Sequence, residues 1–292
     1  MKKSVRLEFY FIAIALFFLC GYVWHSVFVL EHENTKLKVA VLDIGQGDSI
    51  YVEAPNGRQM LIDGGRTSKI LSRLSEVMPF GDRSIDVLVV TNPDADHFAG
   101  FINVLENYDV GMVMESGTVS TSKTYKAFVA LLAEKKIPDV LARSGMDVLL
   151  DAKKNVHMEI LFPDRDVSHF THNDGSIVSR LIYGATSVML TGDATKHTEN
   201  ILVSKYPKEE LESTILKVGH HGSRTSSGAS FVKAVAPKYS VISDGKNNSY
   251  GHPHKETLDT LLSAGVKILR TDELGTIVFQ SDGIEFMRRY QH

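Results

Sequence analysis

Residues 91–100 constrain this chain more than any other segment, because they carry two carboxylates and one imidazole close together. These groups are Asp94, Asp96 and His97, and the apolar run at 85–90 before them is typical of a buried strand. Carboxylates packed this closely repel one another, and a cation between them removes that cost. The segment therefore predicts a strand that delivers ligands to a cation. A solvated acidic turn is the alternative, because Asp is common in turns.

Composition indicates a folded protein without a global nucleic-acid signature. Of the 292 residues, 43% are hydrophobic and 23% are charged, which is typical of one large domain or two smaller ones with a buried core. The net charge is −3, so any contact with nucleic acid must come from a local patch. The single cysteine, Cys20, excludes an internal disulfide and a zinc site built from several cysteines.

The N-terminal segment, residues 1–35, predicts a membrane anchor. Residues 9–30 contain no Asp, Glu, Lys or Arg, and a helix of that length can cross a bilayer. Basic residues precede this run and acidic residues follow it, which places the amino terminus in the cytoplasm and the rest outside. We therefore predict a single-pass transmembrane helix that anchors an extracellular domain to the lipid bilayer of the cell membrane. A cleaved signal peptide is the rival, but no small-x-small site ends the run.

The remaining residues, 37–292, predict one α/β (α+β) domain. Strand-like segments alternate with helical ones, but several early strands are joined by short turns, which favours sheets covered by helices over an all-parallel fold. The predicted strands lie at 36–41, 50–53, 59–62, 85–90, 110–114, 177–183, 187–190, 215–218 and 239–243. The predicted helices lie at 68–77, 98–107, 122–136, 196–205 and 256–264.

Polar side chains recur where the predicted strands end. Because strand ends on one edge of a sheet converge, such scattered groups can form one site. Imidazole and carboxylate ligands on loops suit a catalytic metal, whose bound water has a pKa of about 7, and two ions about 3.5–4 Å apart suit displacement at phosphorus. Beyond the first segment, the groups at strand ends are Asp193, His220, His221, His252 and His254.

Asp63 also ends a predicted strand and is followed by Gly64 and Gly65. A carboxylate in this position can orient a neighbouring metal ligand. It can equally cap a turn, so both interpretations of Asp63 stay open.

Six separate motifs carry a family resemblance. The pattern Asn-x-Asp-x-Asp-His at 92–97 is similar to the His-x-His-x-Asp-His signature of the metallo-β-lactamase fold. Together with the segments 42–48, 61–65, 190–193, 216–223 and 250–253, it resembles the ComEC-type branch, the extracellular metallohydrolase domain of competence DNA-uptake channels. The multi-helix channel region of those proteins has no counterpart in these residues, so a stand-alone domain with one anchor is expected.

The resemblance implies a four-layer αββα sandwich with a metal site at one edge. It implies that Asp94 replaces the second histidine of the signature, that Asp96 and His97 bind the second metal, and that Asp193 bridges two ions. His220 matches a late metal ligand of the family by its position at a strand end. Two divalent ions are therefore the expected cofactors.

The resemblance also implies catalytic roles. Asp96, His221 and His252 are the expected catalytic residues, which would complete the metal shell or contact the scissile phosphate. These roles come from the family motif and not from the spacing of the residues in this chain.

Asn92 departs from the family signature, because it stands where the first histidine is expected and an amide oxygen is a weaker ligand than imidazole. His172 or Asn173 could supply the missing ligand, although a lone His172 also suits a surface turn. A site rich in oxygen donors favours manganese or magnesium, with zinc as an alternative.

These features together predict a phosphodiesterase or nuclease that acts on DNA outside the membrane through a metal-activated water. Lys217, Ser223 and Arg224 are the candidate substrate-binding residues, although the basic side chains could be solvated surface charges. Asn92 in place of a histidine would also fit a catalytically inactive binding module. The scarcity of basic residues near the site would also fit a hydrolase of esters, lactones or thioesters. No Gly-x-Ser-x-Gly motif supports a serine hydrolase, and no protein partner is indicated.

Overall fold

The computed structural model describes residues 10–24 and 36–289, and residues 10–24 form a helix. A helix that crosses a bilayer needs about 20 apolar residues. No helix within the two described ranges is both long enough and apolar enough to do so. The predicted transmembrane anchor and cell-membrane location are corrected by this finding. Residues 1–9 and 25–35, which complete the predicted segment, lie outside the described residues.

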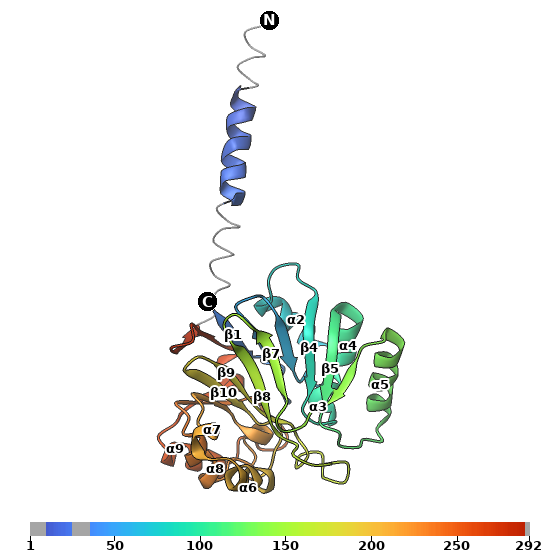
Figure 1. Cartoon of the computed structure of the whole chain (residues 1–292), viewed down its shortest axis with the longest axis vertical. Helices are drawn as coiled ribbons and strands as arrows, with labels where there is room; N and C mark the ends of the chain where they lie inside the picture. Colours follow the sequence, from blue (N-terminus) through green and yellow to red (C-terminus); the bar gives the residue numbers. More distant parts are fainter. Residues whose placement is uncertain (1–9, 25–35, 290–292) are drawn as a thin grey trace, which may run out of the picture.

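Two β-sheets form the centre of the domain (Figure 1). The eight strands of the first sheet follow the order β15 (Phe286–Arg289), β14 (Ile277–Ser281), β1 (Leu37–Val41), β2 (Ile50–Glu53), β3 (Gln59–Ile62), β4 (Ser84–Val90), β5 (Asp109–Glu115) and β6 (Asp139–Leu141). The seven strands of the second follow the order β13 (Lys267–Arg270), β12 (Tyr239–Ile242), β11 (Ile215–Lys217), β10 (Thr186–Leu190), β9 (Val178–Tyr183), β8 (Val156–Phe162) and β7 (Asp147–Asp151).

Each sheet combines an antiparallel part and a parallel part. In the first sheet β1, β2 and β3 pair antiparallel, whereas β3, β4, β5 and β6 run parallel. In the second sheet β7, β8, β9 and β10 pair antiparallel, whereas β10, β11, β12 and β13 run parallel. Parallel strands end at the same edge of their sheet. The predicted ligands follow β4 in one sheet and β10, β11 and β12 in the other.

Helices cover the outer face of each sheet (Figure 1). Beside the first sheet lie α2 (Lys69–Val77), α3 (Ala95–Phe98), α4 (Gly100–Asn107) and α5 (Lys123–Lys135). The elements that follow the strands of the second sheet are α6 (Lys196–Lys205), α7 (Lys208–Leu211), the 3-10 helix η1 (Gly219–Gly222), α8 (Ala229–Val235), α9 (Lys255–Ser263) and α10 (Thr271–Leu274).

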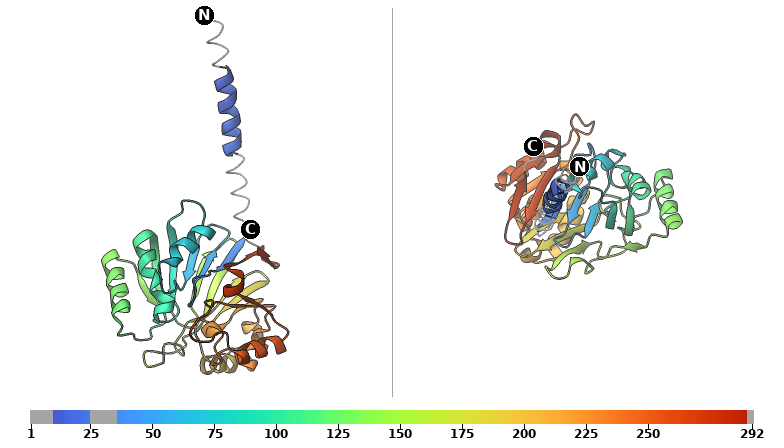
Figure 2. Two further views of the ribbon diagram at one scale, coloured as in Figure 1. Left: turned by 180° about the vertical axis from the view of Figure 1, so that it is seen from behind. Right: turned by 90° about the horizontal axis from the view of Figure 1, so that it is seen from above.

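Apolar side chains at alternate strand positions divide among three hydrophobic cores. In β1, Val39 packs between the sheets, whereas Ala40 faces the helices outside the first sheet. In β10, Val188 packs between the sheets and Met189 faces the helices outside the second sheet. Figure 2 shows the two sheets packed face to face. This arrangement confirms the predicted α/β sandwich of two sheets and helices.

The segment after β4 forms a short helix, although a loop was expected there. α3 starts directly after Asp94, and α4 follows after one residue. Asp96 and His97 therefore project from a helical turn. Gly100 allows this turn to lie close to the end of β3, because a Cβ there would lie 2.1 Å from the Gly64 carbonyl oxygen.

Phe128 tests the core outside the first sheet. Its side chain is 0% exposed, and its ring centroid lies 5.6 Å from that of Phe98. We expect Phe128→Ala to lower the free energy of unfolding by about 3–5 kcal/mol, because the substitution leaves a cavity. Phe80 is 107% exposed, so Phe80→Ala should change stability by less than about 0.5 kcal/mol. Urea unfolding measures both values, and equal effects would contradict the described core.

Candidate metal centre

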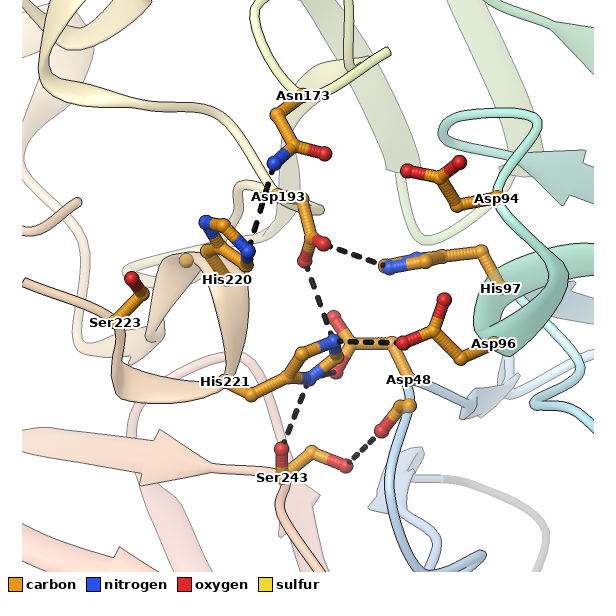
Figure 3. Close-up of polar contacts among 12 residues, drawn as sticks. Asp48, Asp94, Asp96, His97, Asn173, Asp193, His220, His221, Ser223 and Ser243 are labelled. Atoms are coloured by element: carbon orange, nitrogen blue, oxygen red, sulfur yellow. Dashed lines mark hydrogen bonds and ion pairs between the residues drawn. The ribbon is translucent and has the colours of Figure 1, made fainter. Parts of the chain in front are cut away.

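Side chains from both sheets converge at the edge where the parallel strands end. Figure 3 shows Asp96, His97, Asp193 and His221 pointing toward one another. His97 Nε2 lies 3.1 Å from Asp193 Oδ2. His221 Nε2 lies 3.5 Å from Asp193 Oδ1 and 3.6 Å from Asp96 Oδ2. α3 supplies the first two residues, the turn after β10 supplies Asp193, and η1 supplies His221.

Asp63 sets the orientation of the His97 ring. Its Oδ2 lies 2.7 Å from His97 Nδ1, and the Thr91 backbone N–H and hydroxyl donate to its two oxygens at 2.8 and 2.6 Å. An ionised carboxylate only accepts hydrogen bonds, so we assign the proton of His97 to Nδ1. The lone pair of neutral His97 is then on Nε2 and faces Asp193. The structure thus places Asp63 where it orients a ligand, one of its two predicted roles.

A second pair of acceptors sets the orientation of the His221 ring. His221 Nδ1 lies 3.0 Å from the Ser243 carbonyl oxygen and 3.2 Å from Asp48 Oδ1. Because both neighbours are acceptors, Nδ1 carries the proton and Nε2 turns toward Asp96 and Asp193. His221 has a φ of 53°, in the left-handed region that non-glycine residues rarely adopt, which turns its side chain away from the ordinary helical direction.

The four side chains fit a divalent cation. Two imidazole lone pairs face carboxylate oxygens, and acceptors that face each other repel unless a proton or a cation lies between them. His97 Nε2, His221 Nε2 and Asp193 Oδ1 are buried and have no hydrogen-bond partner among the residues that the structure describes. Mixed imidazole and carboxylate donors suit zinc, iron or manganese. A cation bound between such atoms would remove this repulsion.

The pKa values of the two imidazoles in the metal-free state reflect the same excess of hydrogen-bond acceptors. Burial lowers the pKa of His97, but Asp193 and Asp63 outweigh burial and raise it well above its usual value. Burial also opposes protonation of His221, yet Asp193 and Asp48 raise its pKa to about 10. Protons on the two imidazoles therefore offset the carboxylates when no metal is bound. A metal ion would have to displace these protons.

A cavity of about 280 Å³ opens onto these groups. Asp94, Asn173 and His220 line it together with Asp96 and Asp193. These three predicted ligands are the candidates for holding a second ion beside Asp193. His221, which was expected to act in catalysis, occupies the ligand position nearest Asp96, whereas His220 lies beside Asn173, with Nε2 3.4 Å from its Nδ2. His221 therefore lies in a ligand position that was not expected of it, whereas His220 keeps a place among the candidate ligands.

His172 and Asn92, the other predicted weak ligands, are engaged elsewhere. His172 Nδ1 lies 2.7 Å from Asp94 Oδ1 and its Nε2 lies 3.1 Å from the Val119 carbonyl oxygen, so both ring nitrogens face acceptors. Asn92 is fully buried, its Oδ1 accepts the Asp94 backbone N–H at 2.9 Å, and its amide nitrogen donates to Ser176. Both residues are corrected from ligands to supports of the loop that carries Asp94.

The predicted substrate contacts are also revised. Lys217 is 1% exposed and its Nζ lies 2.7 Å from Asp48 Oδ2, so it cannot meet a substrate. Ser223 is buried, and its Oγ accepts from Thr225. Arg224 is exposed but does not line the cavity. These three residues lie close to the predicted ligands in the sequence, but the fold does not place them on the wall of the cavity.

Several residues that line the cavity had no predicted role. Gln46, Arg66 and Tyr250 lie on its wall, and the predicted catalytic residue His252 lies with them. The Tyr250 and His252 rings stack at 5.7 Å, and burial together with neighbouring histidines lowers the pKa of His252 to about 4. Gln46 and Tyr250 belong to motifs of the resemblance, whereas Arg66 follows one and had no signal of its own.

A separate group of possible ligand atoms lies away from this cavity. It consists of Asp147, His157 and Glu159 on β7 and β8, and its members are exposed or half-buried. Surface carboxylates and imidazoles need no metal to satisfy them, because water does so. This group serves as a comparison for the buried one.

Comparisons with known proteins identify the family that this chain resembles. The protein-family model described as "Metallo-beta-lactamase superfamily" matches residues 42–245. ComE operon protein 3 of Bacillus subtilis is 33% identical over 280 residues, and Competence protein ComA of Neisseria gonorrhoeae is 32% identical over 267 residues. The matches cover 90% and 91% of this chain but 35% of each relative, so the chain spans about a third of their length.

One solved structure supports the fold alone. CmlA, a diiron beta-hydroxylase from Streptomyces venezuelae, superposes with a TM-score of 0.54 at 14% identity, over 87% of this chain and 54% of that chain. An identity this low says nothing about the reaction.

Metal affinity should depend on pH. We expect the affinity for Zn²⁺ or Mn²⁺ to rise as the pH increases from about 6 toward 10, because the metal must displace a proton from His221, whose pKa is raised to about 10. The expected slope is up to tenfold per pH unit for each proton released. Competition titration with a chromogenic chelator measures it, and His157→Ala serves as the control that leaves it unchanged. An affinity independent of pH would contradict the assignment.

Proposed function

Because the chain belongs to the metallo-β-lactamase superfamily, whose sequence model matches residues 42–245, we propose that it is a metal-dependent phosphodiesterase that acts on DNA. The resemblance to ComEC-type proteins is confirmed by the superfamily match and the competence-related relatives. The fold implies a metal-dependent hydrolase in general, and it binds divalent ions, typically two. The phosphodiester bond and DNA are the proposed, more specific assignments.

One observation carries the proposal: the Nε2 atoms of His97 and His221 face the carboxylates of Asp96 and Asp193 beside an open cavity. Divalent ions held there would supply a Lewis acid and a hydroxide nucleophile at neutral pH. The chain itself orients the two imidazoles through Asp63 and the Ser243 carbonyl. His252 forms part of the wall against which a substrate would lie.

Arg66 supports a phosphate-bearing substrate. Among the residues that line the cavity it is the one lysine or arginine, and it is exposed. No ion pair within the described part of the chain engages its guanidinium. A free guanidinium binds phosphate through two parallel hydrogen bonds. Arg66 therefore takes the place that the sequence suggested for Lys217.

The name of one relative supports DNA as the substrate. Competence protein ComA of Neisseria gonorrhoeae is named for competence, and the motifs of this chain resemble the ComEC-type branch of competence DNA-uptake channels. The chain spans only about a third of that relative, so its activity as a whole protein comes to this chain only as a proposal.

Loss of the shared carboxylate should abolish turnover. Mutating a residue that only orients a metal ligand typically lowers activity about 10–100-fold. Asp193→Ala removes a candidate ligand itself, so it should lower kcat/KM by at least about 100-fold. The assay follows DNA and bis(p-nitrophenyl) phosphate with the full chain and added Mn²⁺, Mg²⁺ or Zn²⁺. Asp147→Ala is the matched control and should keep full activity. Hydrolysis of esters or lactones without any hydrolysis of phosphodiesters would contradict the proposal.

Arg66 should affect binding more than the chemical step. A charged hydrogen bond to phosphate is worth about 1.5–3 kcal/mol, so we expect Arg66→Ala to raise KM for a phosphodiester at least about tenfold with a smaller change in kcat. Arg66→Lys should recover part of the loss. Arg224→Ala, outside the cavity, is the control. An unchanged KM in Arg66→Ala would remove Arg66 from the substrate site.

A further inference from the structure

A buried ion pair lies directly behind the metal centre. Asp48 and Lys217 are 0% and 1% exposed, and Lys217 Nζ lies 2.7 Å from Asp48 Oδ2. The two residues come from different sheets, because Asp48 precedes β2 and Lys217 is the last residue of β11. Removing two charges from water costs several kcal/mol for each ion. Replacing such a pair with apolar residues of similar volume often leaves a fold at least as stable. The pair therefore points to a role besides stability.

The free oxygen of Asp48 faces a candidate ligand. Asp48 Oδ1 lies 3.2 Å from His221 Nδ1, on the side of the ring opposite to Asp193. Asp63 lies behind His97 in a similar way, at 2.7 Å from its Nδ1, although His221 Nδ1 also has the Ser243 carbonyl oxygen nearer, at 3.0 Å. Each imidazole that faces Asp193 thus has a buried carboxylate behind it.

We propose that Asp48 is a positioning residue that holds the His221 imidazole with Nε2 toward Asp96 and Asp193, and that Lys217 anchors Asp48 in this position. The inference rests on the metal site of the proposed function but not on its substrate. Metal binding measured without substrate therefore tests it separately, and a failure to hydrolyse DNA would leave it standing.

The loop that carries Asp48 is built to approach the site closely. The Asp48 backbone N–H donates to the Asp96 carbonyl oxygen at 3.2 Å, and the Ser243 hydroxyl donates to the Gly47 carbonyl oxygen at 2.8 Å. Gly47 has a φ of 121°, and a Cβ there would lie 2.2 Å from the Asp96 carbonyl oxygen. Only glycine permits this contact. The loop thus ties Asp48 to the same turn that supplies Asp96.

Asp48 could instead be a metal ligand, because its carboxylate lies within 4.8 Å of ligand atoms of His97 and Asp193. The ammonium of Lys217 argues against this role, since it occupies Oδ2 and would repel a second cation on the same carboxylate. Oδ1 is turned to His221. The number of ions bound per chain separates the two roles.

Asp48→Asn tests the positioning role directly. We expect the affinity for Zn²⁺ or Co²⁺ to fall about 10–100-fold with unchanged stoichiometry, as is typical when the partner behind a ligating histidine is lost. In the Co²⁺-loaded protein, the shifted proton resonance of His221 Nδ1–H should move or broaden, whereas that of His97 should not. The matched control is Asp43→Asn, because Asp43 lies in the same loop and pairs with Lys69 and Arg73 instead of an imidazole.

A double variant separates positioning from stability. Asp48→Asn alone leaves the Lys217 ammonium buried without its carboxylate, which destabilises the fold. We expect Asp48→Asn combined with Lys217→Met to regain stability but to keep the lowered metal affinity and the altered His221 resonance. The double variant also carries the test if the single variant does not fold.

Three results would overturn the inference. A double variant that regains both stability and wild-type metal affinity would make the pair a structural one. The loss of one bound ion in Asp48→Asn would make Asp48 a ligand. Wild-type metal affinity in a folded Asp48→Asn would show that His221 needs no carboxylate behind it.

Discussion

Repulsion between acceptor atoms dominates the edge of this sandwich. The Nδ1 atoms of His97 and His221 face oxygen acceptors, so the Nε2 lone pairs of both neutral rings turn toward carboxylates that also only accept. Without a cation, the rings must hold extra protons, which is why the pKa of His221 is raised to about 10 despite its burial. The site is therefore costly to keep in a neutral, metal-free form, and a cation relieves it.

The two-sheet architecture explains how residues distant in sequence reach this point. The parallel strands β4, β10, β11 and β12 all end at one edge, and each is followed by a turn that carries a titratable or cavity-lining group. The hydrophobic core between the sheets fixes the distance between these turns. Glycine at 47 and 100 lets the turns approach one another closely. The ligands are thus held by the packing of the fold.

Local pattern predicted much of this arrangement. The alternation in β1 and the apolar run of β4 identified strands. The strand-end positions of His97 and Asp193 indicated side chains that the fold brings within 3.1 Å of each other. The short helix α3 was missed because four residues carry too little periodicity to distinguish a turn of helix from a loop. The place of the His221 ring among the ligands could not be predicted, because it depends on positive φ angles in η1.

Other parts of the site needed three-dimensional information. Lys217 is a charged residue beside the ligands in sequence, which suggested a substrate contact, yet its partner Asp48 comes from the other sheet. Arg66 belongs to no motif and joins the cavity only through the fold. Pairings between distant segments of this kind leave no signal in the spacing of residues.

The most direct test of the metal centre is diffraction from crystals of the full chain soaked in Mn²⁺ or Zn²⁺, measured at the absorption edge of the metal. The account predicts an anomalous peak within coordination distance of His97 Nε2, His221 Nε2 and Asp193. A peak at Asp147, His157 and Glu159 instead, or no peak at the buried site under saturating metal, would contradict it.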